Sequence, residues 1–204
     1  LMKSVERAAN GLWGLTLAVY VGYLLIFLVF AAALLRFPFD YDQGEGFELY
    51  DTVLHAQGQW PYRDPNVYPF YTSIYPPVFH LVTAPLVWAF GPQLWTGRLV
   101  GTLATLLAAA AIGWGVWRET RRAPVAALSG LAFVASNYVY HIGPLFRQHM
   151  FMVMLETLAV VVLAGGSFSD SASRQPPAAN NHSRLILGLA LLLLAGYTKQ
   201  LAVA

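Results

Sequence analysis

The sequence predicts an all-α polytopic membrane protein with about five transmembrane helices and in-plane amphipathic helices in its first extracytoplasmic loop. Hydrophobic residues make up 57% of the 204 positions and charged residues only 11%, and several apolar runs are long enough to cross a bilayer. The chain has no cysteine, so it has neither a disulfide framework nor a thiolate nucleophile. Its net charge of +2, without a basic tract, argues against nucleic acid as a partner.

The first predicted span covers residues 11–35, which carry no charge. This run exceeds the roughly 20 apolar residues that a crossing needs, and it lacks the short core and cleavage site of a signal peptide. Lys3 and Arg7 precede it, so the positive-inside rule places the N-terminus in the cytoplasm. Residues 36–97 are then expected to form the first extracytoplasmic loop.

The first part of this loop has helical periodicity. Phe47, Tyr50 and Leu54 recur on one face, while Glu48 and Asp51, with Thr52 and His55, take the opposite face. This pattern predicts an amphipathic helix that lies on the membrane.

Three acids, Asp40, Asp42 and Glu45, crowd the turn before this helix. Asp42 followed three residues later by Glu45 is typical of a capping box, which is one explanation. A cap needs only one acid, however, and mutual repulsion among three is costly without a function or a bound cation. The cluster is therefore also a candidate catalytic site.

Residues 78–90 are apolar but number only 13, contain Pro85, and are bracketed by proline and glycine. This segment is too short to cross untilted, so we expect it to lie in the outer interface. In the alternative, where it crosses, Arg118, Arg121 and Arg122 would all lie outside, which the positive-inside rule disfavours.

Four further spans are expected at residues 97–117, 123–142, 150–166 and 185–204. Residues 167–184 are polar and without periodicity, so they are expected to form a cytoplasmic linker. The chain begins with Leu before Met2 and stops within an apolar run. We therefore expect residues 1–204 to be the N-terminal part of a longer transmembrane domain.

This topology gathers distant polar residues at the outer face. Arg147 and His149 fall in the second outer loop, and Lys199 falls near the outer end of the fifth span. Glu156 lies one heptad after His149, on the same helix face and roughly 10 Å deeper. An acid inside a membrane span is a functional candidate; the alternative is a buried structural pair between Glu156 and Lys199.

Several segments, taken in order, resemble the beginning of GT-C superfamily membrane glycosyltransferases, in the branch of the protein O-mannosyltransferases and the lipid A aminoarabinose transferase. They follow an N-terminal span and an acidic outer loop, and they read GQWPYRD, YPPVFHLVTAPLVWAFG, GRLVGTLATLLAAA and YTKQ. The resemblance covers nearly the whole chain. It departs from the family at three places. The acids are split as Asp42-Gln43-Gly44-Glu45 instead of adjacent, Tyr75 stands where some relatives have a basic residue, and His149 stands where others have an acid at the outer start of the fourth span.

The resemblance implies an enzyme that moves a sugar from a polyprenyl-phosphate donor to a glycan, lipid or protein acceptor. It would be a multi-pass protein of the inner (plasma) membrane with an extracytoplasmic active site. Asp42 or Glu45 would act as base, with Asp40 beside them. Arg147 and Lys199 would hold the donor phosphate. The remaining expected substrate-binding residues are Tyr75, His149 and Glu156.

Two questions stay open at this point. One histidine among carboxylates does not decide whether a divalent metal ion takes part as a cofactor. An acidic vestibule with Glu156 and Lys199 in the spans also suits a transporter or channel, although such proteins tend to show repeated halves. A third possible function, besides glycosyltransferase and transporter or channel, is a non-catalytic scaffold in which the loop helix only covers the end of a helix bundle.

Overall fold

The computed structural model describes residues 2–167 and 180–200, and within these ranges all regular secondary structure is helical. The predicted linker lies mostly outside the described residues, as do Arg174 and residues 201–204. The helices are α1 (Met2–Arg36), α2 (Glu45–Ala56), α3 (Val78–Phe90), α4 (Leu94–Thr120), α5 (Ala123–Ala135), α6 (Asn137–Ile142), α7 (His149–Ser167) and α8 (Asn180–Gly196).

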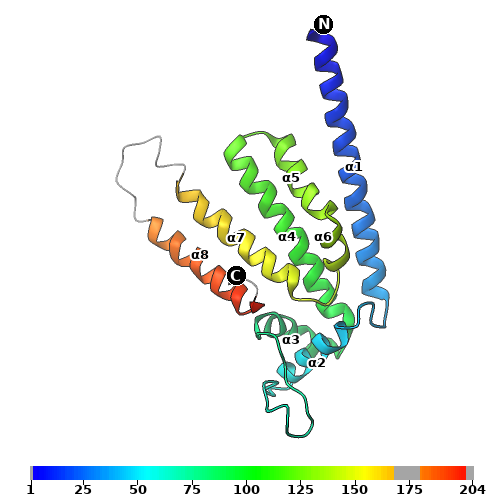
Figure 1. Ribbon diagram of the computed structural model, residues 1–204, viewed down its shortest axis with the longest axis vertical. Helices are drawn as coiled ribbons and strands as arrows, with labels where there is room; N and C mark the ends of the chain where they lie inside the picture. The colour runs from blue at the N-terminus through cyan, green and yellow to red at the C-terminus, as the bar shows by residue number, and fades with distance from the viewer. Residues whose placement is uncertain (1, 168–179, 201–204) are drawn as a thin grey trace.

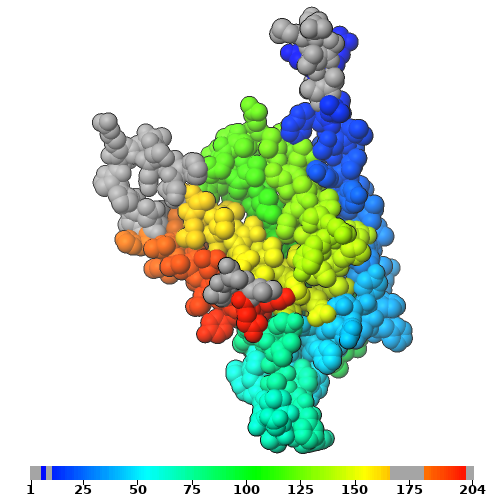
Figure 2. Space-filling model, viewed as in Figure 1, coloured from blue at the N-terminus to red at the C-terminus, as the bar shows by residue number. Residues whose placement is uncertain are grey.

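The long helices pack side by side in the order α8, α7, α4, α5 and α1, and the α2–α3 pair covers one end of this layer (Figure 1). The loop between α2 and α3 projects beyond the helix ends (Figure 2). Two helices, over Gly11–Arg36 and Leu94–Thr120, are long and apolar enough to cross a membrane. The fold class is therefore confirmed as helical with candidate spans.

Small residues permit the close packing of this layer. A Cβ added at Gly130 of α5 would lie 2.6 Å from the carbonyl oxygen of Ala109 in α4. A Cβ at Gly101 of α4 would lie 2.6 Å from the carbonyl oxygen of Leu145, in the loop before α7. Such close backbone approach at small residues is characteristic of helix packing in membranes.

Two of the predicted spans differ in the structure. The expected helix over residues 123–142 is broken at Ser136, whose extended backbone ends α5 and whose side chain accepts a hydrogen bond from the Val139 N–H at 3.4 Å. The last helix ends at Gly196, so Lys199 follows α8 instead of lying within it.

The α2–α3 pair also departs from expectation in one respect. Helix α3 has the predicted bounds, but α2 turns its polar face toward the protein: Glu48 and Asp51 are buried, whereas Phe47 is 62% exposed. The capping-box interpretation is wrong for Asp42, because the N-cap of α2 is Gly44 and makes no side-chain cap bond. The Glu45 half of the box is formed, since Glu45 Oε2 accepts from the Tyr41 N–H at 2.9 Å and from the Asp42 N–H at 3.5 Å.

Arg98 is the first reason why the polar face of α2 is buried. Its side chain is fully buried in the first turns of α4. Its Nε and Nη2 donate to the two oxygens of Glu45, at 2.8 and 2.7 Å. The remaining N–H groups donate to carbonyl oxygens at and just after the end of α1: those of Leu34, Phe37 and Phe39. All five guanidinium donors are thus satisfied.

Glu45 extends this connection to a fourth segment, since its Oε1 also accepts from the Phe146 N–H at 2.8 Å. Burial alone would raise the pKa of Glu45, but the bonds from Arg98, Phe146 and Tyr41 outweigh it and hold the pKa below its ordinary value. The Arg98–Glu45 pair therefore joins the end of α1, the start of α2, α4 and the loop before α7.

Replacing Arg98 with Met should destabilise the protein by about 3 to 5 kcal/mol, because Glu45 would remain buried and uncompensated. Adding Glu45→Leu to this variant should restore much of the loss, since two apolar groups need no partner. Denaturant unfolding in detergent, followed by tryptophan fluorescence, measures both effects. Arg36→Met, at an exposed arginine, is the matched control; an equal loss in the control would contradict the assignment.

Candidate functional site

A cavity of about 420 Å³ opens beside α2 at the end of the helix layer that α2 and α3 cover. We call it the acidic pocket. It is lined by Asp42, Gln43, Gly44, Phe47, Glu48, Asp51, Tyr71, Thr72, Ile74, Tyr75 and Arg147. The sequence-predicted residues Asp42, Tyr75 and Arg147 thus meet in one cavity, although Arg147 is far from the other two in the chain.

Asp42 and Arg147 form an ion pair at the mouth of the pocket. The Arg147 Nε donates to Asp42 Oδ2 at 2.7 Å, and its Nη2 donates to the same oxygen. The Arg147 Nη1 also lies 3.5 Å from Glu48 Oε1. Side-chain exposure is 36% for Asp42 and 18% for Arg147, so both are accessible to a ligand.

Gly44 makes room for this arrangement. A Cβ at Gly44 would lie about 2.0 to 2.1 Å from the guanidinium atoms of Arg147. Because the φ of Gly44 is −91°, glycine is required here by space and not by backbone conformation.

Glu48 lies behind the ion pair and is only 2% exposed. When the Gln148 amide nitrogen faces it, that nitrogen donates to both Glu48 oxygens, at 2.7 and 3.2 Å. Burial raises the pKa of Glu48 to about 7, with a further rise from Asp51 and an opposing effect from Arg147 and Gln148. Glu48 is therefore a carboxyl that titrates near neutral pH.

His80 of α3 faces Glu48 from the other side and is fully buried. Its Nε2 lies 3.4 Å from Glu48 Oε2 and 4.0 Å from Asp51 Oδ2. Burial, together with the neighbouring His55, lowers the pKa of His80 to about 3. The imidazole is consequently neutral near pH 7, and its contact with Glu48 is not an ion pair.

Asp51 is fixed by two hydroxyl groups from the loop before α3. Tyr71 donates to Asp51 Oδ1 at 2.7 Å, and Ser73 donates to Asp51 Oδ2 at 2.6 Å. Burial and the bond to Asp51 both raise the pKa of Tyr71, so its hydroxyl stays a donor. These bonds hold the loop against α2.

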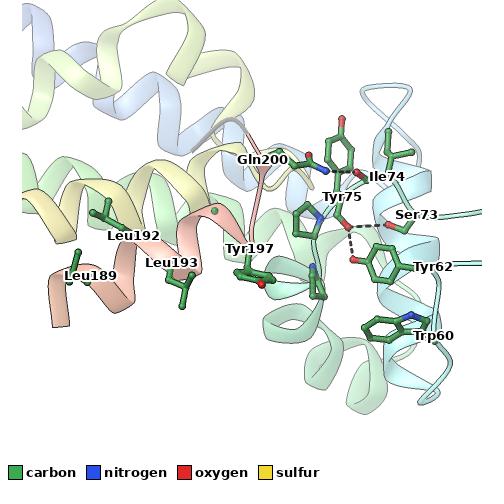
Figure 3. Close-up of a pocket in the computed structure, with 13 residues that line it drawn as sticks. Trp60, Tyr62, Ser73, Ile74, Tyr75, Leu189, Leu192, Leu193, Tyr197 and Gln200 are labelled. Carbon is green, nitrogen blue, oxygen red and sulfur yellow. Dashed lines mark hydrogen bonds between the residues drawn. The ribbon is translucent and has the colours of Figure 1, made fainter. Parts of the chain in front are cut away.

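A second cavity, of about 860 Å³, adjoins the acidic pocket. We call it the apolar groove. Leu189, Leu192 and Leu193 of α8 line one side, and Trp60 and Tyr62 stand on the other (Figure 3).

Ile74 and Tyr75 line both cavities and so form a common wall. Two hydrogen bonds hold this wall: Tyr62 donates to the Tyr75 carbonyl oxygen at 2.5 Å, and the Gln200 amide donates to that of Ile74 at 3.0 Å (Figure 3). A single ligand with a polar and an apolar part could therefore touch both cavities.

Lys199 lies beside this wall, although it lines neither cavity. It is 7% exposed, bonds to His149 Nε2, and has its ammonium 5.7 Å from the centre of the Tyr75 ring. The structure thus brings Lys199, His149 and Tyr75 together, as the topology predicted.

Three other predicted site residues lie elsewhere. Glu45 is fully buried against Arg98 and does not line the pocket, and Asp40 is exposed beside Gly46. Glu156 lines a separate cavity of about 490 Å³ between α4 and α7, with Arg118. No ion pair joins Glu156 to Lys199 in the described part of the chain, so the alternative of a structural pair is wrong.

Sequence reasoning missed Arg98 and the contacts of Glu48 with Gln148 and His80. Arg98 carried a usable signal, because a lone charge at the start of an apolar run needs a buried partner. The partnership of Glu48 with His80 had no comparable local signal.

A metal centre is not assigned to the acidic pocket. Among residues 2–167 and 180–200, no group of three or more His, Asp or Glu side chains is arranged to hold a metal ion.

Replacing Gly44 with Ala should displace Arg147 from Asp42 and destabilise the protein by about 1 to 3 kcal/mol, the usual cost of overpacking. Gly46→Ala is the matched control. Its Cβ would meet only the end of the exposed Asp40 side chain, and alanine favours the helix. Chemical unfolding in detergent should therefore separate the two variants; equal stability would contradict the close contact.

The acidic pocket and the apolar groove are thus adjacent cavities of different chemistry with one shared wall. Comparison of the chain with family models, curated proteins and solved structures finds no match.

Proposed function

We propose that this chain carries the site of a membrane glycosyltransferase, which moves a sugar from a polyprenyl-phosphate donor to an acceptor at the extracytoplasmic face. The observation that carries the proposal is the shared wall of Ile74 and Tyr75 between the acidic pocket and the apolar groove. A lipid-linked sugar has an apolar chain, a phosphate and a polar sugar in sequence. Its chain suits the groove, and its phosphate and sugar suit the pocket.

The arrangement of charges along the helices supports five spans, formed by α1, α4, α5 with α6, α7 and α8. Arg118 and Arg121 end α4, Arg122 precedes α5, and Arg184 lies in the first turns of α8, all at the end opposite α2 and α3 (Figure 1). By the positive-inside rule that end is cytoplasmic, and the acidic pocket is extracytoplasmic.

In the proposed reaction, the acceptor hydroxyl oxygen attacks the anomeric carbon and forms the new C–O bond. The bond from that carbon to the phosphate oxygen breaks, and its electron pair leaves with the polyprenyl phosphate. Asp42 takes the proton of the hydroxyl, and Arg147 and Lys199 stabilise the negative charge on the leaving phosphate.

The ion pair between Asp42 and Arg147 gives this scheme an order of events. Arg147 holds Asp42 through N–H groups that a phosphate would also bind. A donor phosphate that binds Arg147 competes with Asp42 for the same N–H groups, so it would release Asp42 to accept a proton. Donor binding would thereby activate the base.

The rival function, passage of a cation or solute, needs polar groups that continue through the membrane. The cavity that contains Glu156 shares no lining residue with the acidic pocket. This separation favours chemistry at one surface over passage through the layer.

Asp42→Asn should reduce turnover by about 10² to 10⁴-fold while the protein stays folded, because an amide cannot accept the proton. Release of polyprenyl phosphate from a radiolabelled lipid-linked sugar measures turnover, and thermal unfolding measures the fold. Asp64→Asn, at an exposed acid outside the pocket, should leave turnover as in the wild type. Turnover of Asp42→Asn at the wild-type rate would refute Asp42 as base.

The topology can be tested by cysteine labelling. The chain has no native cysteine, so only an introduced cysteine reacts with a thiol reagent. Single cysteines at the exposed positions Gln57 and Gln93 should both react with an impermeant thiol reagent in intact cells. A cysteine at Thr120, exposed at the opposite end, should react only after the membrane is opened. Reaction at Gln57 without reaction at Gln93 would mean that α3 crosses the membrane.

A further inference from the structure

The hydrogen bonds of Thr52 fix the tautomer of His80. The Thr52 hydroxyl donates to the Glu48 carbonyl oxygen at 2.7 Å, one turn earlier in α2. Its only proton is thereby used, so toward His80 Nδ1, at 3.0 Å, it acts as acceptor. The proton of the neutral imidazole consequently lies on Nδ1, and Nε2 presents a lone pair.

This lone pair faces two carboxyl groups and has no donor. His80 Nε2 is a buried polar atom without a hydrogen-bond partner, 3.4 Å from Glu48 Oε2 and 4.0 Å from Asp51 Oδ2. A lone pair against an ionised carboxylate would be repulsive, and a buried polar group without a partner is costly. A proton located between His80 Nε2 and Glu48 Oε2 removes the repulsion between the lone pair and the carboxylate. It also gives the buried nitrogen a hydrogen-bond partner.

Of the two carboxyl groups, Glu48 is the one that can hold this proton. Asp51 is farther from Nε2, and two separate hydroxyl groups donate to its two oxygens, at 2.7 and 2.6 Å, whereas the donor to the Glu48 oxygens is the single amide of Gln148, which is 3.2 Å from Oε2. Glu48 Oε2 is nearer, and Glu48 is 2% exposed. The rise in the pKa of Glu48 to about 7, caused first by burial, agrees with this assignment.

We propose that Glu48 is a positioning residue: it shares one proton with His80, and its neutral form leaves Arg147 with Asp42 as its sole charged carboxylate partner, so that Arg147 can bind an anionic phosphodiester. The anion is identified by the proposed function, on which this part rests. The shared proton rests on geometry alone.

Charged and titratable groups face Glu48 from every element packed around it. They are Asp51 and Glu45 on α2, His80 and the stacked His55 beside it, Asp42 and Tyr71 from the loops, Arg147 before α7, Arg98 of α4 and Lys199 after α8. Arg98 is committed to Glu45, and Lys199 contacts His149. Arg147 is thus the cation in direct contact with Glu48, 3.5 Å from Oε1.

The consequence is a pH-dependent affinity with a defined sign. Below about pH 7, Glu48 holds its proton, so Asp42 and Arg147 together are electrically neutral and a phosphate has only Asp42 to displace from Arg147. Above it, ionised Glu48 competes for Arg147 and repels the anion. For one coupled proton, affinity should fall by up to about tenfold per pH unit above the Glu48 pKa.

The first arm of the test measures the proton without any ligand. Infrared spectra of the purified protein in detergent should show a protonated-carboxyl stretch at about pH 6, which fades as the pH rises through about 7. Glu48→Gln should remove it, and Glu119→Gln, the same change at an exposed position outside the pocket, should keep it. His80→Gln, whose amide can donate to Glu48, should move the transition to lower pH.

The second arm measures the affinity for a short prenyl methyl phosphodiester, whose single negative charge does not change over this range. Binding to the wild type and to Glu119→Gln should weaken between about pH 6 and pH 8 by about tenfold or less. Binding to Glu48→Gln should not change with pH, because the amide cannot ionise. If the wild type binds the phosphodiester with an affinity that does not change with pH, the link between Glu48 and Arg147 is overturned.

The two arms separate the possible failures. A carboxyl stretch that survives Glu48→Gln, or that is missing in the wild type at about pH 6, overturns the shared proton. A titrating stretch in a protein that binds no phosphodiester at any pH supports the shared proton but overturns the phosphate as ligand, and with it the proposed function.

Discussion

The buried guanidinium of Arg98 is the constraint on which the rest of the structure depends. Desolvation of a guanidinium costs several kcal/mol, and only a carboxylate and a full set of hydrogen bonds offset it. Glu45 supplies the carboxylate and the last turn of α1 supplies carbonyl oxygens. These groups come from segments that are distant in the chain. The need of the Arg98 guanidinium for acceptors therefore fixes the end of α1 and the start of α2 relative to α4.

This constraint also explains the orientation of α2, which sequence periodicity alone did not predict. The spacing of Phe47, Tyr50 and Leu54 correctly indicated a helix, and the bounds of α3 followed from its flanking prolines and Gly91. Periodicity defines two faces but not which of them is buried. The choice was decided by partners on other segments: Arg98 donates to Glu45 and Gln148 to Glu48. Two hydroxyl groups, those of Tyr71 and Ser73, donate to Asp51. Likewise, an apolar run of 20 residues gave no sign that Ser136 would divide α5 from α6.

The candidate site was predictable to the extent that topology determines it. The predicted alternation of helices places Asp42, Tyr75, Arg147, His149 and Lys199 at one end of the molecule. In the structure, Asp42, Tyr75 and Arg147 line one cavity, and Lys199 contacts both His149 and the Tyr75 ring. Roles within the cluster depend on contacts that span the chain: the bond of Glu45 to Arg98 joins residues 53 positions apart. The heptad from His149 to Glu156 placed the two on one helix but could not predict that different cavities surround them.

Asp42 and Glu48 have the same chemical group in opposite environments, and this difference gives the pocket its chemistry. The Asp42 side chain is 36% exposed and is bound by the Arg147 guanidinium. Glu48 lies a few residues further, buried against a histidine that offers a lone pair, an environment that favours the neutral form. Arg147 touches both. If both acids were ionised, the two carboxylates and Arg147 would carry a net charge of −1 and would repel an anion. If both were neutral, no base would remain. A site that binds an anion and removes a proton therefore needs one carboxylate that can act as base and a second carboxyl that does not compete for Arg147, and the burial of Glu48 beside His80 favours its neutral form.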